Sequence, residues 1–263
     1  MGFSCKNGRV CGMDYIRFGG GDRVFVMLSG LGDGLKTVKG TAAPMAWMYR
    51  SFAKEFTVYL FSRKEPLPAG YTTRDMAADL AAGMGELGIE KAAVLGVSMG
   101  GMIAQWLAID FPHMVEKLIL TVTCAQPNEI LVSSVEEWME QARQNDHTAL
   151  MESNLRKIYS QTYYRANKWM IPILGKVTKP RSYDRFLILA QACLTHNAAA
   201  ELPKIQCPTF VIGGEQDLAL GGEPSRQMAK LIPGAKLLMY PQWGHGLYEE
   251  AKDFNSQVLE FLQ

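Results

Sequence analysis

Long apolar segments are missing from this sequence. None of its 263 residues fall in a run near the roughly 18 apolar residues that a membrane-spanning helix needs. The first ten residues, MGFSCKNGRV, also lack the apolar core of a secretory signal peptide. These two absences argue against a membrane span and against export. We therefore expect a cytoplasmic protein.

An excess of charge of either sign is also missing. Lys and Arg total 27, and Asp and Glu total 26, so the formal net charge is +1 at pH 7. A chain with this balance has no electrostatic reason to bind nucleic acid or an anionic membrane surface. Apolar residues make up 48% of the sequence and charged residues 20%, which is usual for a globular protein. The length allows one large α/β domain or two small ones.

Cysteine pairs and metal-binding clusters are absent as well. The number of cysteines, five, is odd, and their spacings fit neither a zinc site nor a Cys-x-x-Cys pair. We interpret them as reduced thiols, which agrees with a cytoplasmic location. No group of histidines, cysteines or carboxylates suggests a metal. The cysteines are Cys5, Cys11, Cys124, Cys193 and Cys207.

Strand and helix patterns alternate along most of the chain. A hairpin is expected at the N-terminus, with a turn at Asn7-Gly8 between strands at 3–5 and 10–18. The further strands are expected at 24–28, 57–61, 92–97, 118–123, 209–212 and 236–240, and the helices at 46–56, 73–87, 99–109, 225–231 and 255–262. This alternation predicts a mostly parallel sheet with helices on both faces.

The alternation stops between residues 127 and 200. Helical patterns occur near 135–144, 148–164 and 183–196, with interruptions at Pro172, Gly175 and Pro180, and no strand is apparent. We predict an α/β core of residues 1–125 and 201–263, with residues 126–200 inserted as a helical cap or lid. An insertion after the carboxyl end of a strand lies over the place where open α/β sheets bind ligands. Its many aromatic residues either pack on the sheet or line an apolar pocket.

The strongest local motif is GVSMG at residues 96–100, followed by Gly101. It lies where a predicted strand ends and a predicted helix begins, which is the context of a nucleophile elbow. Serine is a weak nucleophile and must be held out on a sharp turn to meet a base. At a helix N-terminus, backbone N–H groups also favour developing negative charge. The pattern therefore predicts Ser98 as a nucleophile, and the alternative is a glycine-rich helix start without chemistry.

With this motif at its centre, the chain resembles the α/β-hydrolase superfamily, in its serine-nucleophile esterase and lipase branch, over nearly its whole length. In that family the nucleophile is followed by an acid and then a histidine, each in a loop after a strand. The resemblance implies an α/β-hydrolase fold with a helical cap. Members with an aspartate nucleophile, such as haloalkane dehalogenases and epoxide hydrolases, are disfavoured by Ser98.

The resemblance identifies His245 as the general base, because WGHG directly follows the last predicted strand. A glycine on each side was expected to leave the ring free to move toward a hydroxyl. Asp217, in GGEQD after the preceding strand, matches the acid that orients the histidine. Glu215 is a close competitor for that role, and Glu129 is a more distant one.

Three other histidines are present. His113 follows a proline at a helix end and is expected on the surface, whereas His147 and His196 lie in the insertion and are expected to be solvated or structural.

Residues 25–34, FVMLSGLGDG, form a strand that runs into a glycine loop. A dinucleotide-binding loop is disfavoured because its third glycine would be Leu35. We place this strand third in the sheet, where these hydrolases carry the oxyanion loop. The resemblance implies that the N–H groups of Leu31 and Met99 form an oxyanion hole. The usual His-Gly of that loop is Ser29-Gly30 here, which puts the support of the loop in question. The access loop SRKEPLP, residues 62–68, also departs from the family pattern.

The expected function is hydrolysis of a small carboxylic ester, lactone or thioester through an acyl-enzyme, with water as the second partner. The triad mechanism needs no cofactor and no metal. The same triad serves carbon–carbon bond hydrolases, amidases and perhydrolases, and some proteins of this fold act as small-molecule receptors or signalling modules. The sequence leaves these alternatives open, as it does the oligomeric state.

Overall fold

The structure, a computed structural model, describes residues 5–263 of the chain. It begins with a hairpin of strands β1 (Lys6–Val10) and β2 (Met13–Gly19), which pair antiparallel. The turn between them lies at Cys11 and Gly12, both with positive φ, at 47° and 76°. Glycine adopts this conformation without steric cost, so Gly12 accounts for the position of the turn.

The turn that we predicted at Asn7-Gly8 is wrong. Both residues lie inside β1, where Gly8 faces Tyr15 of β2. A Cβ atom at Gly8 would clash with the phenol ring of Tyr15. This glycine therefore allows close packing under an aromatic ring and does not form the turn. Residues 3 and 4 of the first predicted strand lie outside the described residues.

The sheet has eight strands in the order β1-β2-β4-β3-β5-β6-β7-β8. Only β1 and β2 run antiparallel to their neighbours, so the sheet is mostly parallel, as predicted. Strand β3 is third along the chain, but it lies fourth across the sheet, between β4 and β5, which corrects our placement. The remaining strands are β3 (Arg23–Leu28), β4 (Phe56–Lys64), β5 (Ala92–Val97), β6 (Val115–Thr121), β7 (Thr209–Gly214) and β8 (Lys236–Tyr240).

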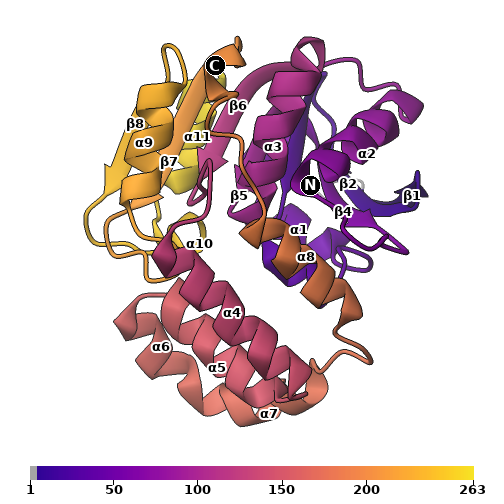
Figure 1. The fold of residues 1–263 in the computed structure, drawn as a ribbon. Helices are drawn as coiled ribbons and strands as arrows, with labels where there is room; N and C mark the ends of the chain where they lie inside the picture. Colours follow the sequence, from indigo (N-terminus) through magenta and orange to yellow (C-terminus); the bar gives the residue numbers. More distant parts are fainter. Residues whose placement is uncertain (1–4) are drawn as a thin grey trace.

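Helices cover both faces of the sheet (Figure 1). One buried cluster joins the sheet to α2 (Thr73–Glu86), α3 (Met99–Asp110) and α9 (Glu223–Leu231). The other joins it to α1 (Ala42–Met48), α10 (Leu247–Glu250) and α11 (Phe254–Leu262). The helix predicted at 46–56 is instead α1 followed by a single 3₁₀ turn, η2 (Phe52–Lys54). Among residues 5–263, no helix is both long and apolar enough to cross a bilayer.

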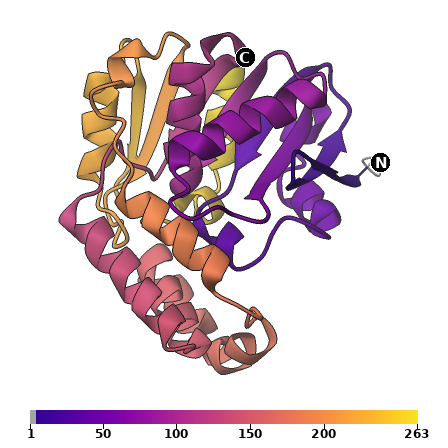
Figure 2. The same cartoon turned by 45° about the vertical axis from the view of Figure 1, so that its right-hand side comes forward.

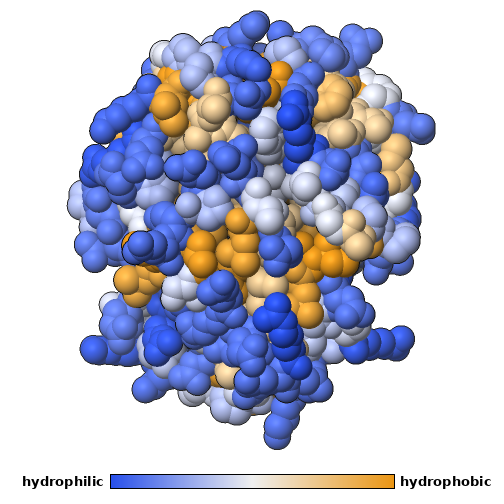
Figure 3. Space-filling view, in the orientation of Figure 1, coloured by the Kyte–Doolittle hydropathy of each residue, from blue (hydrophilic) through white to orange (hydrophobic). Residues whose placement is uncertain are grey.

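The chain between β6 and β7 is helical, as predicted, and contains no strand. Figure 2 shows these helices grouped at one end of the molecule, and Figure 3 shows apolar side chains along their junction with the rest. The helices are α4 (Glu129–Arg143), α5 (His147–Ile158), α6 (Gln161–Asn167), α7 (Ile171–Val177) and α8 (Asp184–Leu194), with a 3₁₀ turn, η4 (Lys168–Met170). The boundaries of the cap at residues 126 and 200 stay a prediction.

Helix α7 was not expected, because Pro172 and Gly175 suggested an interruption. Pro172 stands in the first turn of α7, where its missing N–H has no intrahelical acceptor to lose. Gly175 packs against α5, where a Cβ atom would come within 2.5 Å of Thr148 Oγ1. Tertiary packing thus explains a glycine that local propensity alone disfavours in a helix.

Candidate active site

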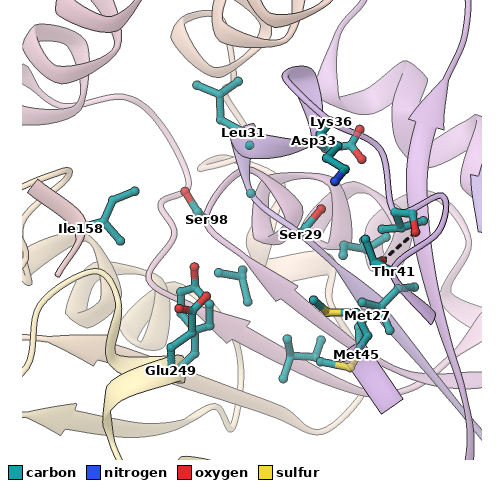
Figure 4. Close-up of a pocket in the computed structure, with 18 of the residues that line it drawn as sticks. Met27, Ser29, Leu31, Asp33, Lys36, Thr41, Met45, Ser98, Ile158 and Glu249 are labelled. Carbon is teal, nitrogen blue, oxygen red and sulfur yellow. Dashed lines mark hydrogen bonds between the residues drawn. The ribbon is translucent and has the colours of Figure 1, made fainter. Parts of the chain in front are cut away.

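Ser98 stands on a strained turn between β5 and α3. Its φ of 54° and ψ of −121° lie where residues with a side chain rarely occur. The Ser98 N–H donates to Thr121 O at 2.9 Å, and Ser98 O accepts from the Gly101 N–H at 2.8 Å. These backbone bonds hold the serine out at the carboxyl end of β5. Figure 4 shows its hydroxyl directed into the cavity described below.

The glycines around Ser98 are required by close backbone contacts. A Cβ atom at Gly96 would clash with Gly100, and one at Gly100 would clash with the carbonyl of Leu28. A Cβ atom at Gly101 would come within 2.5 Å of the side chain of Thr123. The small residues of GVSMG therefore let strand β3 and helix α3 approach the turn.

His245 and Asp217 are brought into direct contact. His245 Nδ1 lies 2.8 Å from Asp217 Oδ2, and both side chains are buried. The second carboxylate oxygen accepts from the N–H groups of Ala219 at 2.8 Å and Leu220 at 3.0 Å. A carboxylate held on both oxygens orients the ring, and Nδ1 as the donor leaves Nε2 as an acceptor.

The structure does not join Ser98 to His245 by a hydrogen bond among the residues it describes, but both line the same cavity. The two competitors for the acid lie elsewhere. Glu215 pairs with Arg226, and Glu129 is exposed at the start of α4. Of the three carboxylates considered, only Asp217 contacts His245.

The glycines that flank His245 serve close packing. A Cβ atom at Gly244 would come within 2.8 Å of Gln216 O, and one at Gly246 within 2.9 Å of the Tyr159 ring. The Gly246 N–H also donates to Ile158 O at 2.6 Å. The loop of His245 is therefore held on one side by the loop that contains Gln216 and Asp217. On the other side it is held by residues 158 and 159 of the insertion. This differs from the freedom of movement that we expected from the two glycines.

The remaining histidines lie apart from this pair. His113 is exposed, as expected. His147 and His196 are buried, and each is hydrogen-bonded to a threonine: His147 Nε2 to Thr178 Oγ1 at 3.0 Å, and His196 Nδ1 to Thr73 Oγ1 at 2.8 Å. They are structural and not solvated.

Burial of His196 predicts a loss of stability in acid. Burial lowers the pKa of His196 to about 4 from the ordinary value of 6.5, so the unfolded chain binds this proton more readily than the folded one. The stability from a neutral His196 is complete above pH 6.5 and is lost as the pH falls toward 4, by about 3 kcal/mol. Chemical denaturation between pH 7 and 4 measures it. We expect His196→Gln to flatten this dependence and the exposed control His113→Gln to keep it, and equal slopes in all three proteins would contradict it.

A cavity of about 370 Å³ opens in front of Ser98. Its walls come mainly from β3, the loop after it, α1, the end of β5 and α10, with one residue of β4 and three residues of the insertion. The cavity is largely apolar, with a few polar side chains, as small-molecule sites usually are. It is lined by Met27, Leu28, Ser29, Gly30, Leu31, Gly32, Asp33, Lys36, Thr37, Val38, Thr41, Met45, Met48, Tyr49, Leu60, Leu95, Val97, Ser98, Trp138, Asn154, Ile158, His245, Tyr248 and Glu249.

A second and much smaller cavity, of about 20 Å³, meets Ser98 and His245 from the side of the cap. A space of this size holds about one water molecule. Apart from Ser98 and His245 its walls are apolar: Leu31, Met102, Leu131, Val135, Trp138, Cys193, Ala219 and Leu220. Burial raises the pKa of the Cys193 thiol to about 12, so this wall is uncharged. Cys124, which we considered as a lining residue, is buried and borders neither cavity.

Leu31 and Met99 each begin a helical turn. Leu31 is the first residue of the 3₁₀ turn η1 (Leu31–Gly34), and Met99 is the first residue of α3. The first N–H groups of a helix have no intrahelical acceptor, and no side chain caps either turn. A Cβ atom at Gly30 would lie 3.3 Å from Ser98 Cβ, so the loop of Leu31 passes directly beside the serine. Leu31 and Met99 therefore each start a turn beside Ser98 with an uncapped N–H group, and their role as an oxyanion hole stays a prediction.

Arg63 supports this loop where the family has a histidine. The buried guanidinium donates to the Ser29 carbonyl oxygen and, at 3.2 Å, to Ser29 Oγ. Asp33, two residues beyond Leu31, accepts from the Arg63 N–H at 3.0 Å and from Arg185 Nη2 at 2.6 Å. The loop is thus held on both sides of Leu31, at Ser29 and at Asp33. These contacts support the loop although it has Ser29 in place of a histidine.

Arg185 reaches this network from α8, which belongs to the insertion. It also donates to the carbonyl oxygens of Asp33, Arg63 and Lys64. A Cβ atom at Gly34 would come within 2.8 Å of Phe186 Cα, so α8 packs directly on η1. Burial lowers the pKa of Arg63, and the charge of Asp33 opposes that shift. The Arg185 guanidinium pairs with Asp33, whereas the Arg63 guanidinium donates to Ser29, so this network holds two arginines and one carboxylate.

Sequence reasoning missed this network. The strand was expected to end at residue 61, and Arg63 was taken as part of an unusual access loop, whereas β4 continues to Lys64 and buries it. A charged residue at the end of an apolar strand was the only available signal. Nothing in the sequence pattern links Arg63 to Asp33 or to Arg185.

Removing Arg185 should destabilise the protein strongly. We expect Arg185→Met to lower the free energy of unfolding by about 3 kcal/mol, because it leaves the buried Asp33 carboxylate without its closest cation. Lys204→Met, which breaks the exposed pair with Glu201, is the matched control and should cost less than about 1 kcal/mol. Urea denaturation compares the two, and equal losses would contradict a supporting role for Arg185.

Comparisons with known proteins show the family to which the chain belongs. A family model described as alpha/beta hydrolase fold matches residues 24–252. A putative carbamate hydrolase RutD from Caulobacter sp. is 26% identical over 269 residues, which cover 98% of each chain. A 2-hydroxy-6-oxononadienedioate/2-hydroxy-6-oxononatrienedioate hydrolase from Pseudomonas sp. is 27% identical over 253 residues, covering 93% of this chain and 89% of the relative.

Solved structures agree with the family match. An alpha/beta hydrolase enzyme from a Medee basin deep-sea metagenome library aligns with a TM-score of 0.81 and 25% identity, covering 95% of this chain and 94% of the other. The enol-lactonase from Burkholderia xenovorans aligns with a TM-score of 0.80 and 23% identity, covering 98% and 99%. At this identity the second likeness speaks for the fold alone.

Proposed function

Because this chain belongs to the alpha/beta hydrolase family, we propose that it is a serine hydrolase that cleaves a small carboxylic ester, lactone or thioester. One observation carries the proposal. The strained Ser98 and His245, which is held by the buried Asp217, border the same cavity, although the three residues come from three separate loops at the carboxyl edge of the sheet. Strain is kept at functional sites when the surrounding structure enforces it, and here the elbow glycines do so.

In the proposed mechanism, Ser98 Oγ attacks the substrate carbonyl carbon while His245 Nε2 takes the hydroxyl proton. Asp217 holds the ring through Nδ1 and stabilises the imidazolium. The Leu31 and Met99 N–H groups bind the oxyanion of the tetrahedral intermediate. The intermediate collapses to an acyl-enzyme as His245 gives its proton to the leaving group. Water, deprotonated by His245, then releases the acid and restores Ser98.

The two cavities limit the substrate. A carbonyl carbon at Ser98 carries two substituents, and the spaces that meet there measure about 370 Å³ and about 20 Å³. We therefore propose that one substituent is no larger than a methyl or amino group, whereas the other fills the larger cavity. Esters that are bulky on both sides of the carbonyl should be poor substrates.

A carbamate is the second candidate substrate. The small cavity suits an amino substituent on the carbonyl carbon, and the relative from Caulobacter sp. is named a putative carbamate hydrolase. Carbamates and esters share the same attack on a carbonyl by Ser98. A panel of acetate esters and carbamates of the same alcohol would rank the two classes.

A fluorophosphonate probe tests the proposed function directly. It should add to one residue of the wild type, and peptide mapping should place the adduct on Ser98. Ser98→Ala should not be labelled. Labelling that survives this substitution would remove Ser98 from the role of nucleophile.

A further inference from the structure

Lys36 brings an uncompensated positive charge to the larger cavity. It follows η1 and lines the cavity together with Ser29 and Asp33. Its ammonium group forms no ion pair and no hydrogen bond within residues 5–263. Figure 4 shows the Lys36 amine and the Ser29 hydroxyl on the same side of Ser98, and both residues line the cavity. Lys36 is exposed, so its ammonium group is reached from solvent and also lines the cavity.

The Ser29 hydroxyl is prepared to donate a hydrogen bond. Its oxygen accepts from Arg63 Nη1 at 3.2 Å, and no acceptor for its own proton is present in the described chain. A hydroxyl that accepts from a cation becomes a stronger donor, because bonds in a chain polarise one another. Ser29 therefore offers the cavity an O–H group backed by a buried guanidinium.

The nearest carboxylate does not cancel this charge. Asp33 is bound by the Arg185 guanidinium at 2.6 Å and by the backbone N–H of Arg63. Its carboxylate is therefore paired with Arg185 and not with Lys36. Arginine stays protonated in proteins, and two arginines beside one aspartate leave a net positive charge behind Ser29. Asp14 is a second carboxylate on this side and accepts from Thr37 Oγ1 at 3.0 Å. Lys36, Arg63 and Arg185 together therefore outnumber Asp33 and Asp14 by one charge.

Besides Asp33, the carboxylate that lines the cavity within residues 5–263 is Glu249, on α10, and the further titratable groups of the lining are His245, Tyr49 and Tyr248. The Glu249 carboxylate accepts from the Tyr159 hydroxyl at 2.7 Å, and burial raises its pKa. In Figure 4 Glu249 lies below Ser98, whereas Lys36 lies to its right. Apolar residues make up much of the remaining lining, with Met27, Met45 and Leu60 among them.

We propose that Lys36 and Ser29 form a carboxylate-binding subsite, so that the substrates of this protein carry an anionic carboxylate at the end of a short apolar segment. Lys36 supplies the charge and Ser29 a directed hydrogen bond. The replacement of the family's loop histidine by Ser29 then has a function in substrate selection. This inference rests on the proposed function, since it assigns the substrate class of the same cavity.

A matched ester pair tests the subsite. The acetate ester of para-hydroxybenzoate is compared with the acetate ester of methyl para-hydroxybenzoate. The methyl group of the acetyl side suits the small cavity, and the alcohol side carries the carboxylate into the larger cavity. In the wild type, we expect kcat/KM to favour the carboxylate by roughly tenfold, the effect of one charge-assisted hydrogen bond.

Substitutions assign that preference to the subsite. Lys36→Met should remove most of the tenfold preference, Lys36→Glu should reverse it, and Ser29→Ala should reduce it. The control Lys39→Met, at an exposed lysine that does not line the cavity, should keep it. A wild type without the preference, a preference that survives Lys36→Met, or a preference for an ammonium-bearing ester would overturn the proposal.

A binding measurement separates this proposal from the hydrolase itself. Adipate is titrated into Ser98→Ala by calorimetry, with adipamide as the neutral comparison. Adding Lys36→Met to that variant should weaken adipate binding about tenfold and leave adipamide unaffected. If no ester is hydrolysed, the proposed function fails while this titration still decides the subsite. Equal adipate binding in both variants would overturn the subsite.

Discussion

Replacing Ser98 by alanine is expected to lower kcat by about a millionfold, the loss seen when a nucleophile of a serine triad is removed. Alanine keeps the turn but removes the only hydroxyl that the elbow presents to the cavity. The remaining rate would come from the oxyanion donors and from binding alone. A continuous assay with a para-nitrophenyl ester measures the change.

Stability separates this effect from misfolding. Ser98 is at φ 54°, so Ser98→Gly should remove strain and raise the free energy of unfolding by about 1 kcal/mol, while it abolishes activity as Ser98→Ala does. An inactive but more stable Ser98→Gly would show that the strain serves chemistry. A Ser98→Ala protein that keeps more than a hundredth of the wild-type kcat would contradict the nucleophile assignment.

Replacing Asp217 by asparagine is the second large effect. We expect kcat to fall about ten-thousandfold with little change in KM. The asparagine amide would donate where the carboxylate accepts, and the ring of His245 would then carry its proton on Nε2, facing Ser98. Such a ring cannot take the proton of the serine hydroxyl. The Ala219 and Leu220 N–H groups would still bind the side-chain carbonyl, so the fold should survive.

Glu215→Gln is the matched control for Asp217→Asn. Glu215 lies two residues away in the same loop but pairs with Arg226, and its charge should matter little. We expect kcat to change less than about twofold, because an exposed ion pair contributes little free energy. A larger effect for Glu215→Gln than for Asp217→Asn would transfer the role of the acid to Glu215.

Much of the fold could be predicted because its signals are local. Strand 92–97 and strand 236–240 have the predicted bounds, since each is a short, mostly apolar run with clear breaks at both ends. Errors arose where packing competes with local preference. Gly8 was taken for a turn and packs under Tyr15, and Gly175 was taken for a break and packs against Thr148.

The candidate triad residues were also found in the sequence, because a nucleophile elbow is a strand, a turn and a helix in one continuous segment. The roles of Ser98, Asp217 and His245 stay a prediction, since the geometry supports them and only kinetics can test them. The glycines on each side of His245 were expected to give the ring freedom to move, and the structure shows instead that they allow close packing against Gln216 and Tyr159.

The alternation of strands and helices and the elbow at Ser98 can be recognised along the chain, because each depends on neighbouring residues, and the family resemblance adds the order of Ser98, Asp217 and His245. The support of the loop in FVMLSGLGDG becomes visible only in the folded protein. Arg63 from β4 and Arg185 from the insertion meet at Asp33, and all three are far apart in sequence. Hydrogen bonds and ion pairs depend on distances of about 3 Å, and a pattern along one chain carries no such distances.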